Sequence, residues 1–175
     1  LRLTDISRWL GGYRQLVRCM PNTPALIGAG ITGLYADSAV GPKGRDTAEK
    51  ILRAVGDTLW VDDEAQMDAV TAISGSGPAY VFYFIEALQH AAQNLGIDAP
   101  AARQLAIETF TGAARLAEQS EEDVAVLRQR VTSKGGTTAA ALASFDADNI
   151  AAAILRGVQA AAERSRILGE EMGKD

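Results

Sequence analysis

The segment Val131–Thr138 reads Val-Thr-Ser-Lys-Gly-Gly-Thr-Thr and is followed at once by a run of alanines. Glycine lets a backbone approach a ligand closely, and the first N–H groups of a helix have no partner within the helix. The helix dipole adds to their attraction for a carboxylate or phosphate. The segment therefore predicts a small-anion cradle flanked by hydroxyl donors. The alternative is a plain Gly-Gly turn between helices, with Thr137 as a helix N-cap.

Other candidate sites are weaker. Ser74-Gly-Ser-Gly-Pro78 lacks the later glycine of a dinucleotide-binding turn, and it favours a tight turn between helices. Lys134 precedes the glycine pair, so the segment is not a P-loop. His90 is the only histidine, which excludes a multi-histidine metal site, and we predict no metal.

Composition narrows the function further. The 175 residues are 47% hydrophobic and 22% charged, with a net charge of −5, which is typical of a globular protein. The absence of a basic cluster argues against nucleic acid or an anionic membrane as partner. Cys19 is the only cysteine, which indicates a reducing compartment, and no apolar run is long enough to span a bilayer. We expect a cytoplasmic protein.

The secondary structure predicted to position these residues changes along the chain, from strands mixed with helices to helices alone. Short apolar runs at residues 16–20, 29–36 and 58–61 predict strands. Helical spacing predicts short helices at 4–11, beginning at Thr4 or Asp5, and at 46–55. Helices alone follow, at 64–73, 78–95, 100–117, 121–130 and 148–168. We predict an α/β piece over residues 1–62 and an all-helical domain over 63–175. The alanine-rich helices lack large residues to cover one another, so we expect an intimate dimer.

Three stretches, taken with their order and spacing, resemble one family. They are Arg18–Pro24 (Arg-Cys-Met-Pro-Asn-Thr-Pro), Asp68–Tyr80 and Val131–Thr138. The chain is similar to pyrroline-5-carboxylate reductases over nearly all its length. The resemblance implies that residues 1–62 are the C-terminal part of an NAD(P)-binding Rossmann domain. It implies that residues 63–175 form a helical dimerisation and substrate-binding domain of the 6-phosphogluconate-dehydrogenase C-terminal type.

The implied reaction is the reduction of 1-pyrroline-5-carboxylate to L-proline by NADPH or NADH, the last step of proline biosynthesis. The resemblance also implies a homodimer, which in the family can assemble into a homodecamer. Because the chain lacks the phosphate-binding glycine turn, we expect little reductase activity from it if nothing precedes Leu1. The alternative function is a catalytically silent helical dimerisation module with an anion-binding turn.

Site residues follow from the resemblance position by position. Thr138 corresponds to the catalytic hydroxyl that hydrogen-bonds the ring nitrogen, which stabilises the transition state most. The remaining substrate-binding positions are Ser133, Gly135, Gly136, Thr137, Glu64 and Thr71. Cofactor-binding positions are Met20, Pro21, Asn22 and Arg130. Lys134 stands where many members have proline, so the loop should be less stiff and more positive.

Overall fold

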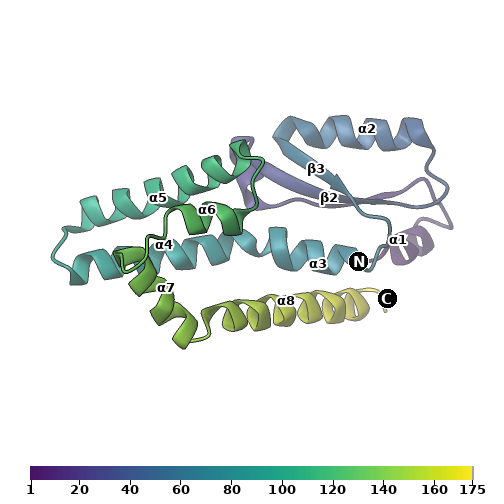
Figure 1. Cartoon of the computed structure of the whole chain (residues 1–175). Coiled ribbons are helices and arrows are strands. Elements are labelled where there is room, and N and C mark those ends of the chain that lie inside the picture. Colours follow the sequence, from purple (N-terminus) through teal and green to yellow (C-terminus); the bar gives the residue numbers. More distant parts are fainter. Residues whose placement is uncertain (175) are drawn as a thin grey trace. The chain divides into compact units, whose positions relative to one another are not determined.

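The computed structural model describes residues 1–174, which form two compact units (Figure 1). Unit 1 consists of residues 1–79 and 156–174, and unit 2 consists of residues 80–155. The fold class agrees with expectation, since a short sheet comes first and helices follow. The two units describe compactness within one chain, and the domain boundary between residues 62 and 63 stays a prediction.

Unit 1 is built on a three-stranded mixed sheet in the order β1-β2-β3. The strands are β1 (Val17–Met20), β2 (Gly30–Ala36) and β3 (Gly56–Trp60), so the three predicted strands are confirmed. β1 pairs antiparallel with β2, with Met20 opposite Gly33, and β2 pairs parallel with β3. β1 ends at Met20 and leads into the loop that carries Pro21 and Asn22, two more of the predicted cofactor-binding residues.

Helices lie on both faces of the sheet because side chains alternate along each strand (Figure 1). On one face, α2 (Pro42–Leu52) meets β3, where the Trp60 indole N–H donates to Glu49 at 3.0 Å. On the other face, α3 (Gln66–Val70) lies so close to β2 that a Cβ on Gly33 would stand 2.5 Å from Val70 Cγ1. Thr32, Leu34 and Ala36 of β2 are almost fully buried.

Several helix starts differ from the predicted ones, and the helix predicted from residue 121 begins at Val124. α1 (Leu3–Trp9) begins earlier, with Arg2 as N-cap, and Asp5 accepts the Arg2 N–H at 3.2 Å from inside the first turn. α2 begins at Pro42 rather than at residue 46. Pro42 is preorganised for the first turn and has no N–H to leave unpaired, whereas the apolar spacing starts only later. Short 3-10 turns cover Thr23–Ile27 (η1) and Arg53–Val55 (η2).

The prediction of one continuous α-helix over residues 64–73 is wrong. α3 is short and widens into a π-helical turn, η3 (Thr71–Gly75), in which the Ser76 N–H donates to the Thr71 carbonyl at 2.8 Å. The hydroxyls of Thr71 and Ser74 donate to the carbonyls of Met67 and Val70 at 2.8 and 2.9 Å. The turn is therefore held by its own side chains.

Unit 2 is helical. It contains most of α4 (Gly77–Asn94), then α5 (Ala99–Gln119), α6 (Val124–Arg130), α7 (Thr137–Ala147) and the start of α8 (Ile150–Met172). Asp98 and Asp123 cap α5 and α6 by accepting backbone N–H groups at 2.8 and 2.7 Å. Within residues 1–174 no single helix could span a membrane by length and apolarity, although α7 and α8 would qualify if taken together.

The remainder of α8 belongs to unit 1, far from that unit's other residues in sequence. The Ser165 hydroxyl donates to Asp68 at 2.7 Å, which joins α8 to α3. At the end of α8, the Gly173 carbonyl accepts from Arg8 at 2.5 Å. These contacts close unit 1 with the last turns of the chain.

Candidate functional site

The glycine pair forms a tight turn that leads into α7. The Gly136 N–H donates to the Ser133 carbonyl at 3.0 Å, and Gly135 has a φ of +72°, which glycine adopts without strain. Gly136 is the N-cap and α7 starts at Thr137, so the alternative in which Thr137 is the N-cap is wrong. No side chain caps this helix start.

Hydroxyl groups surround this uncapped start. Among residues 1–174, the side-chain oxygens of Ser133, Thr137 and Thr138 have no hydrogen-bond partner, whereas the nearby Thr132 hydroxyl donates to the Arg128 carbonyl at 2.6 Å. Ser133 lies against Gly136, where any Cβ would collide with its hydroxyl. The first N–H groups of α7 have no partner within the helix. The turn can therefore offer backbone and hydroxyl donors to a small anion.

Arg130, at the end of α6, is paired in this chain. Its guanidinium lies 2.5 Å from a carboxylate oxygen of Glu122, and its side chain is 66% exposed. An exposed ion pair of this kind is worth little and can be exchanged for another anion. The predicted contact of Arg130 with the cofactor stays a prediction.

Met20 is the last residue of β1 in unit 1, and Pro21 and Asn22 follow it. The Asn22 side-chain carbonyl accepts the Ile31 N–H at 3.0 Å, which fixes the loop to the start of β2. The amide N–H groups of Asn22 make no hydrogen bond within residues 1–174. This loop thus presents the amide donors of a side chain whose carbonyl is fixed by a hydrogen bond.

Glu64 and Thr71, also in unit 1, already have partners. One Glu64 carboxylate oxygen accepts the Leu3 N–H at 2.7 Å and an Arg18 N–H at 3.2 Å, and both ionic side chains are less than one-fifth exposed. The Thr71 hydroxyl is used within the π turn. Both residues have a role in the fold, and their substrate-binding roles stay predictions.

The predicted site residues thus fall into two groups, one on each compact unit. Unit 1 carries Met20, Pro21, Asn22, Glu64 and Thr71, and unit 2 carries Arg130, Ser133, Gly135, Gly136, Thr137 and Thr138. Within each unit, hydrogen bonds to neighbouring residues fix the backbone or side chains of several members of the group.

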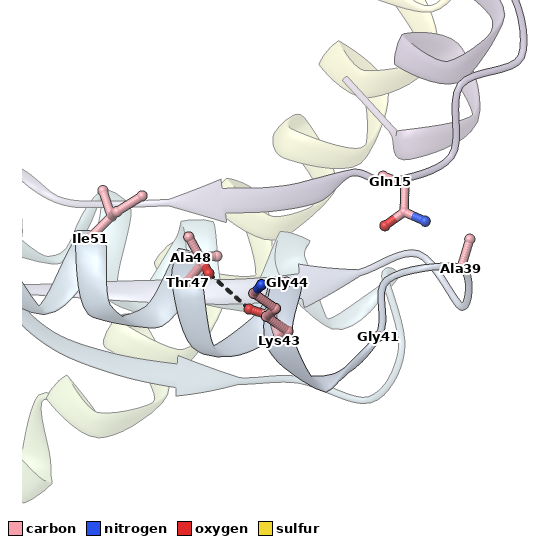
Figure 2. A pocket seen from close by; sticks show the side chains of 8 residues that line it. All are labelled: Gln15, Ala39, Gly41, Lys43, Gly44, Thr47, Ala48 and Ile51. Carbon is pink, nitrogen blue, oxygen red and sulfur yellow. Dashed lines mark hydrogen bonds between the residues drawn. The ribbon is translucent and has the colours of Figure 1, made fainter.

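Two grooves accompany the sheet of unit 1. A mainly apolar groove of about 360 Å³ lies between β2, β3 and the α3–η3 segment, with Gly33, Val70 and Ser74 in its lining. A second, open groove of about 740 Å³ lies along α2 (Figure 2), where Lys43 and Thr47 are joined by a hydrogen bond of 2.8 Å. Neither carries a cluster of groups suited to catalysis.

Other chemistry has little support in the described residues. Cys19 is exposed, but desolvation by the surrounding protein raises the pKa of its thiol, which disfavours the thiolate that nucleophilic attack requires. Among residues 1–174, no three His, Cys, Asp or Glu side chains are grouped to hold a metal ion.

One contact of the segment Met20–Asn22, called the cofactor loop below, was not predicted from the sequence. A Cβ on Gly75 would stand 2.7 Å from the terminal methyl of Met20, so these two residues meet without room for a side chain. The glycine in Ser74-Gly-Ser-Gly-Pro78 was the available signal, because an isolated glycine often marks a close approach.

Comparison with known proteins identifies relatives of the whole chain. Residues 64–168 match the family model described as pyrroline-5-carboxylate reductase dimerisation. The pyrroline-5-carboxylate reductase of Pseudomonas aeruginosa is 48% identical over 97% of this chain and 62% of that protein. The corresponding protein of Haemophilus influenzae is 47% identical over 92% of this chain and 60% of that protein. The chain thus spans about three-fifths of these curated relatives.

Solved structures give the same result. The pyrroline-5-carboxylate reductase of Coxiella burnetii has a TM-score of 0.89 and 44% identity, covering 93% of this chain and 60% of that one. The pyrroline carboxylate reductase of Plasmodium falciparum, solved with NADP bound, has a TM-score of 0.88 and 31% identity, covering 97% of this chain and 68% of that one.

Proposed function

Because this chain belongs to the pyrroline-5-carboxylate reductase family, we propose that the protein carrying it reduces 1-pyrroline-5-carboxylate to L-proline in the cytoplasm. In this reaction C5 of the cyclic imine gains a hydride and the ring nitrogen gains a proton. The match of residues 64–168 carries the proposal. The uncapped start of α7, with its unpaired hydroxyls, supports it independently.

The α7 start suits the substrate chemically. The carboxylate of the imine would accept hydrogen bonds from Ser133 and from the first N–H groups of α7, at the positive end of the helix dipole. Thr138, at the second position of the helix, would place its hydroxyl toward the ring nitrogen. A donor held there stabilises the developing charge on nitrogen more than it stabilises the ground state. In this assignment, Gly135 and Gly136 supply the close backbone approach.

A nicotinamide cofactor, NADPH or NADH, supplies the hydride when bound. The cofactor loop fits such a ring, since Asn22 has its amide donors free and its carbonyl fixed by Ile31. Met20 and Pro21 would give an apolar edge that excludes water. Arg130 would exchange Glu122 for an anionic part of the cofactor, and Glu64 and Thr71 would border the substrate.

We further propose that the protein is an obligate dimer that can assemble into a decamer. Apolar side chains of unit 2 that are more than two-fifths exposed in the single chain support this: Val81, Phe82, Tyr83, Leu88, Leu95, Leu105, Leu116, Val124, Val131, Phe145, Ile154 and Leu155. The matched family model is named for dimerisation. Light scattering should give the mass of a dimer or decamer, and a stable monomer would contradict the proposal.

The direct test is an assay of the full-length protein with 1-pyrroline-5-carboxylate, following loss of NADPH or NADH absorbance and formation of proline. Turnover with either cofactor supports the reductase. A well-folded dimer that turns over no imine would instead support the second candidate, a catalytically silent dimerisation module. The exposed apolar residues of unit 2 favour that candidate as the alternative.

A further inference from the structure

The contact between Met20 and Gly75 joins the cofactor loop to the π turn. A Cβ built on Gly75 would lie 2.7 Å from Met20 Cε and 3.7 Å from Thr71 Cγ2. The second distance is ordinary packing, whereas the first is too short for any real Cβ. The Met20 methyl therefore occupies the space that a side chain at residue 75 would need.

The π turn brings Gly75 to this position. One extra residue in a helix rotates everything that follows by about 100° around the axis. The Ser76 N–H reaches back to Thr71, and Ala72 within the turn is fully buried. The hydroxyl bonds of Thr71 and Ser74 described above stabilise the widened turn. Gly75 is thus presented by a firm backbone.

Met20 is the more adjustable partner. It ends β1 opposite Gly33, and the backbone after it is held by Pro21 and by the bond from Ile31 to Asn22. The side chain itself has three rotatable bonds and can fill many spaces. Packing of its methyl on Gly75 restricts that freedom.

We propose that Gly75 is a positioning residue, which fixes the Met20 side chain at the carboxyl end of β1 by admitting its methyl against the π turn. This inference rests on the proposed function, in which Met20 borders the nicotinamide. A methionine held in one rotamer gives the ring a defined apolar surface, and preorganisation of this kind lowers the cost of binding.

The test uses the full-length protein with Gly75→Ala, and Gly77→Ala as matched control. A Cβ at Gly77 meets nothing within 4 Å, and residue 77 is the first of α4. Since the nearest atom at residue 75 is the end of a flexible side chain, alanine there should turn Met20 aside without unfolding the protein. We expect about a tenfold loss in kcat/KM, carried mainly by a higher KM for the cofactor, because small misplacements near reacting groups are costly.

The same two changes in a Met20→Ala background isolate the contact. Without the methyl, Gly75→Ala should cause no further loss. Equal kinetics for the Gly75 and Gly77 variants, or an equal loss from Gly75→Ala in both backgrounds, would overturn the proposal.

Methyl NMR of isotope-labelled methionine provides a readout that needs no activity. The Met20 methyl signal should shift in Gly75→Ala and stay in place in Gly77→Ala. An unmoved signal would refute the contact. If the wild-type protein turned over no imine while this signal moved, the proposed function would fail and the packing contact would stand.

Discussion

Replacement of Thr138 by alanine is the sharpest test of the site at the start of α7. We expect kcat of the full-length protein to fall about ten- to a thousandfold, or roughly 1.4–4 kcal/mol of transition-state stabilisation, the scale of one lost oriented donor. Thr138 is half-buried, and its hydroxyl has no hydrogen-bond partner within residues 1–174. Its removal therefore leaves no other group unpaired.

The thermal stability of Thr138→Ala should not fall with its kcat. Alanine is a better helix former than threonine by a few tenths of a kcal/mol, and residue 138 lies within the first turn of α7. The melting temperature of Thr138→Ala should therefore equal or slightly exceed that of wild type. A large loss of kcat with an unchanged melting temperature separates a chemical role from a structural one.

Thr132→Ala is the matched control. The Thr132 hydroxyl donates to the Arg128 carbonyl at 2.6 Å, so its loss should cost about 0.5–1.5 kcal/mol of stability while kcat stays near wild type. Thr138→Ser keeps the hydroxyl and should recover most of the rate. Steady-state kinetics at saturating imine, with both cofactors, measure these values. A wild-type kcat in Thr138→Ala, or a Thr138→Ser variant as slow as Thr138→Ala, would remove Thr138 from the mechanism.

Three further perturbations test unit 1. Gly33→Ala should bring its new Cβ into collision with Val70, destabilise the protein by about 1–3 kcal/mol and lower the melting temperature. Adding Val70→Ala should recover part of this loss. If the stability losses of the two single variants simply added in the double variant, the contact would be refuted. Glu64→Gln should lower the melting temperature, since each charged hydrogen bond is worth about 1.5–3 kcal/mol; an intact melting temperature with a raised KM for the imine would instead favour a role in binding. The hydrogen bond from the Trp60 indole N–H, followed by those from other donors, lowers the pKa of Glu49. The ionised Glu49 carboxylate therefore contributes its full stabilisation at pH values above the usual carboxyl pKa. This stabilisation is lost as the pH falls through the lowered pKa. Acid unfolding of Glu49→Gln should therefore show a shallower decline than wild type in melts below about pH 4.5, and parallel curves would contradict this.

The sequence predicted the strands well because each is a short apolar run bounded by turn residues. It predicted the start of α2 poorly, since Pro42-Lys-Gly has no apolar periodicity and Pro42 is the only signal. It could not predict the π turn at Thr71–Gly75, because nothing in local propensity distinguishes one extra residue from a continuous helix.

The candidate site also contains features that could be predicted from local sequence and contacts that could not. The uncapped α7 start followed from Gly135, Gly136 and the hydroxyl residues around them, which are local features. The pairing of Glu64 with Arg18 joins residues 46 positions apart, and it depends on how β1 and the following segments pack. The bond from Ile31 to Asn22 likewise depends on the fold of η1. Such contacts change which atoms are free to bind a ligand.

Closure of unit 1 by α8 has a consequence for synthesis on the ribosome. The sheet and α3 are translated before α8. The hydrogen bonds of Asp68 with Ser165 and of Arg8 with Gly173 can therefore form only after the end of α8 has been synthesised. Contacts so distant in sequence form late and leave apolar surface exposed in the meantime. The helices of unit 2, which are translated in between, can form from local contacts alone. A nascent chain would therefore complete its second unit before its first, and a premature stop within α8 would leave unit 1 without the helix that closes it.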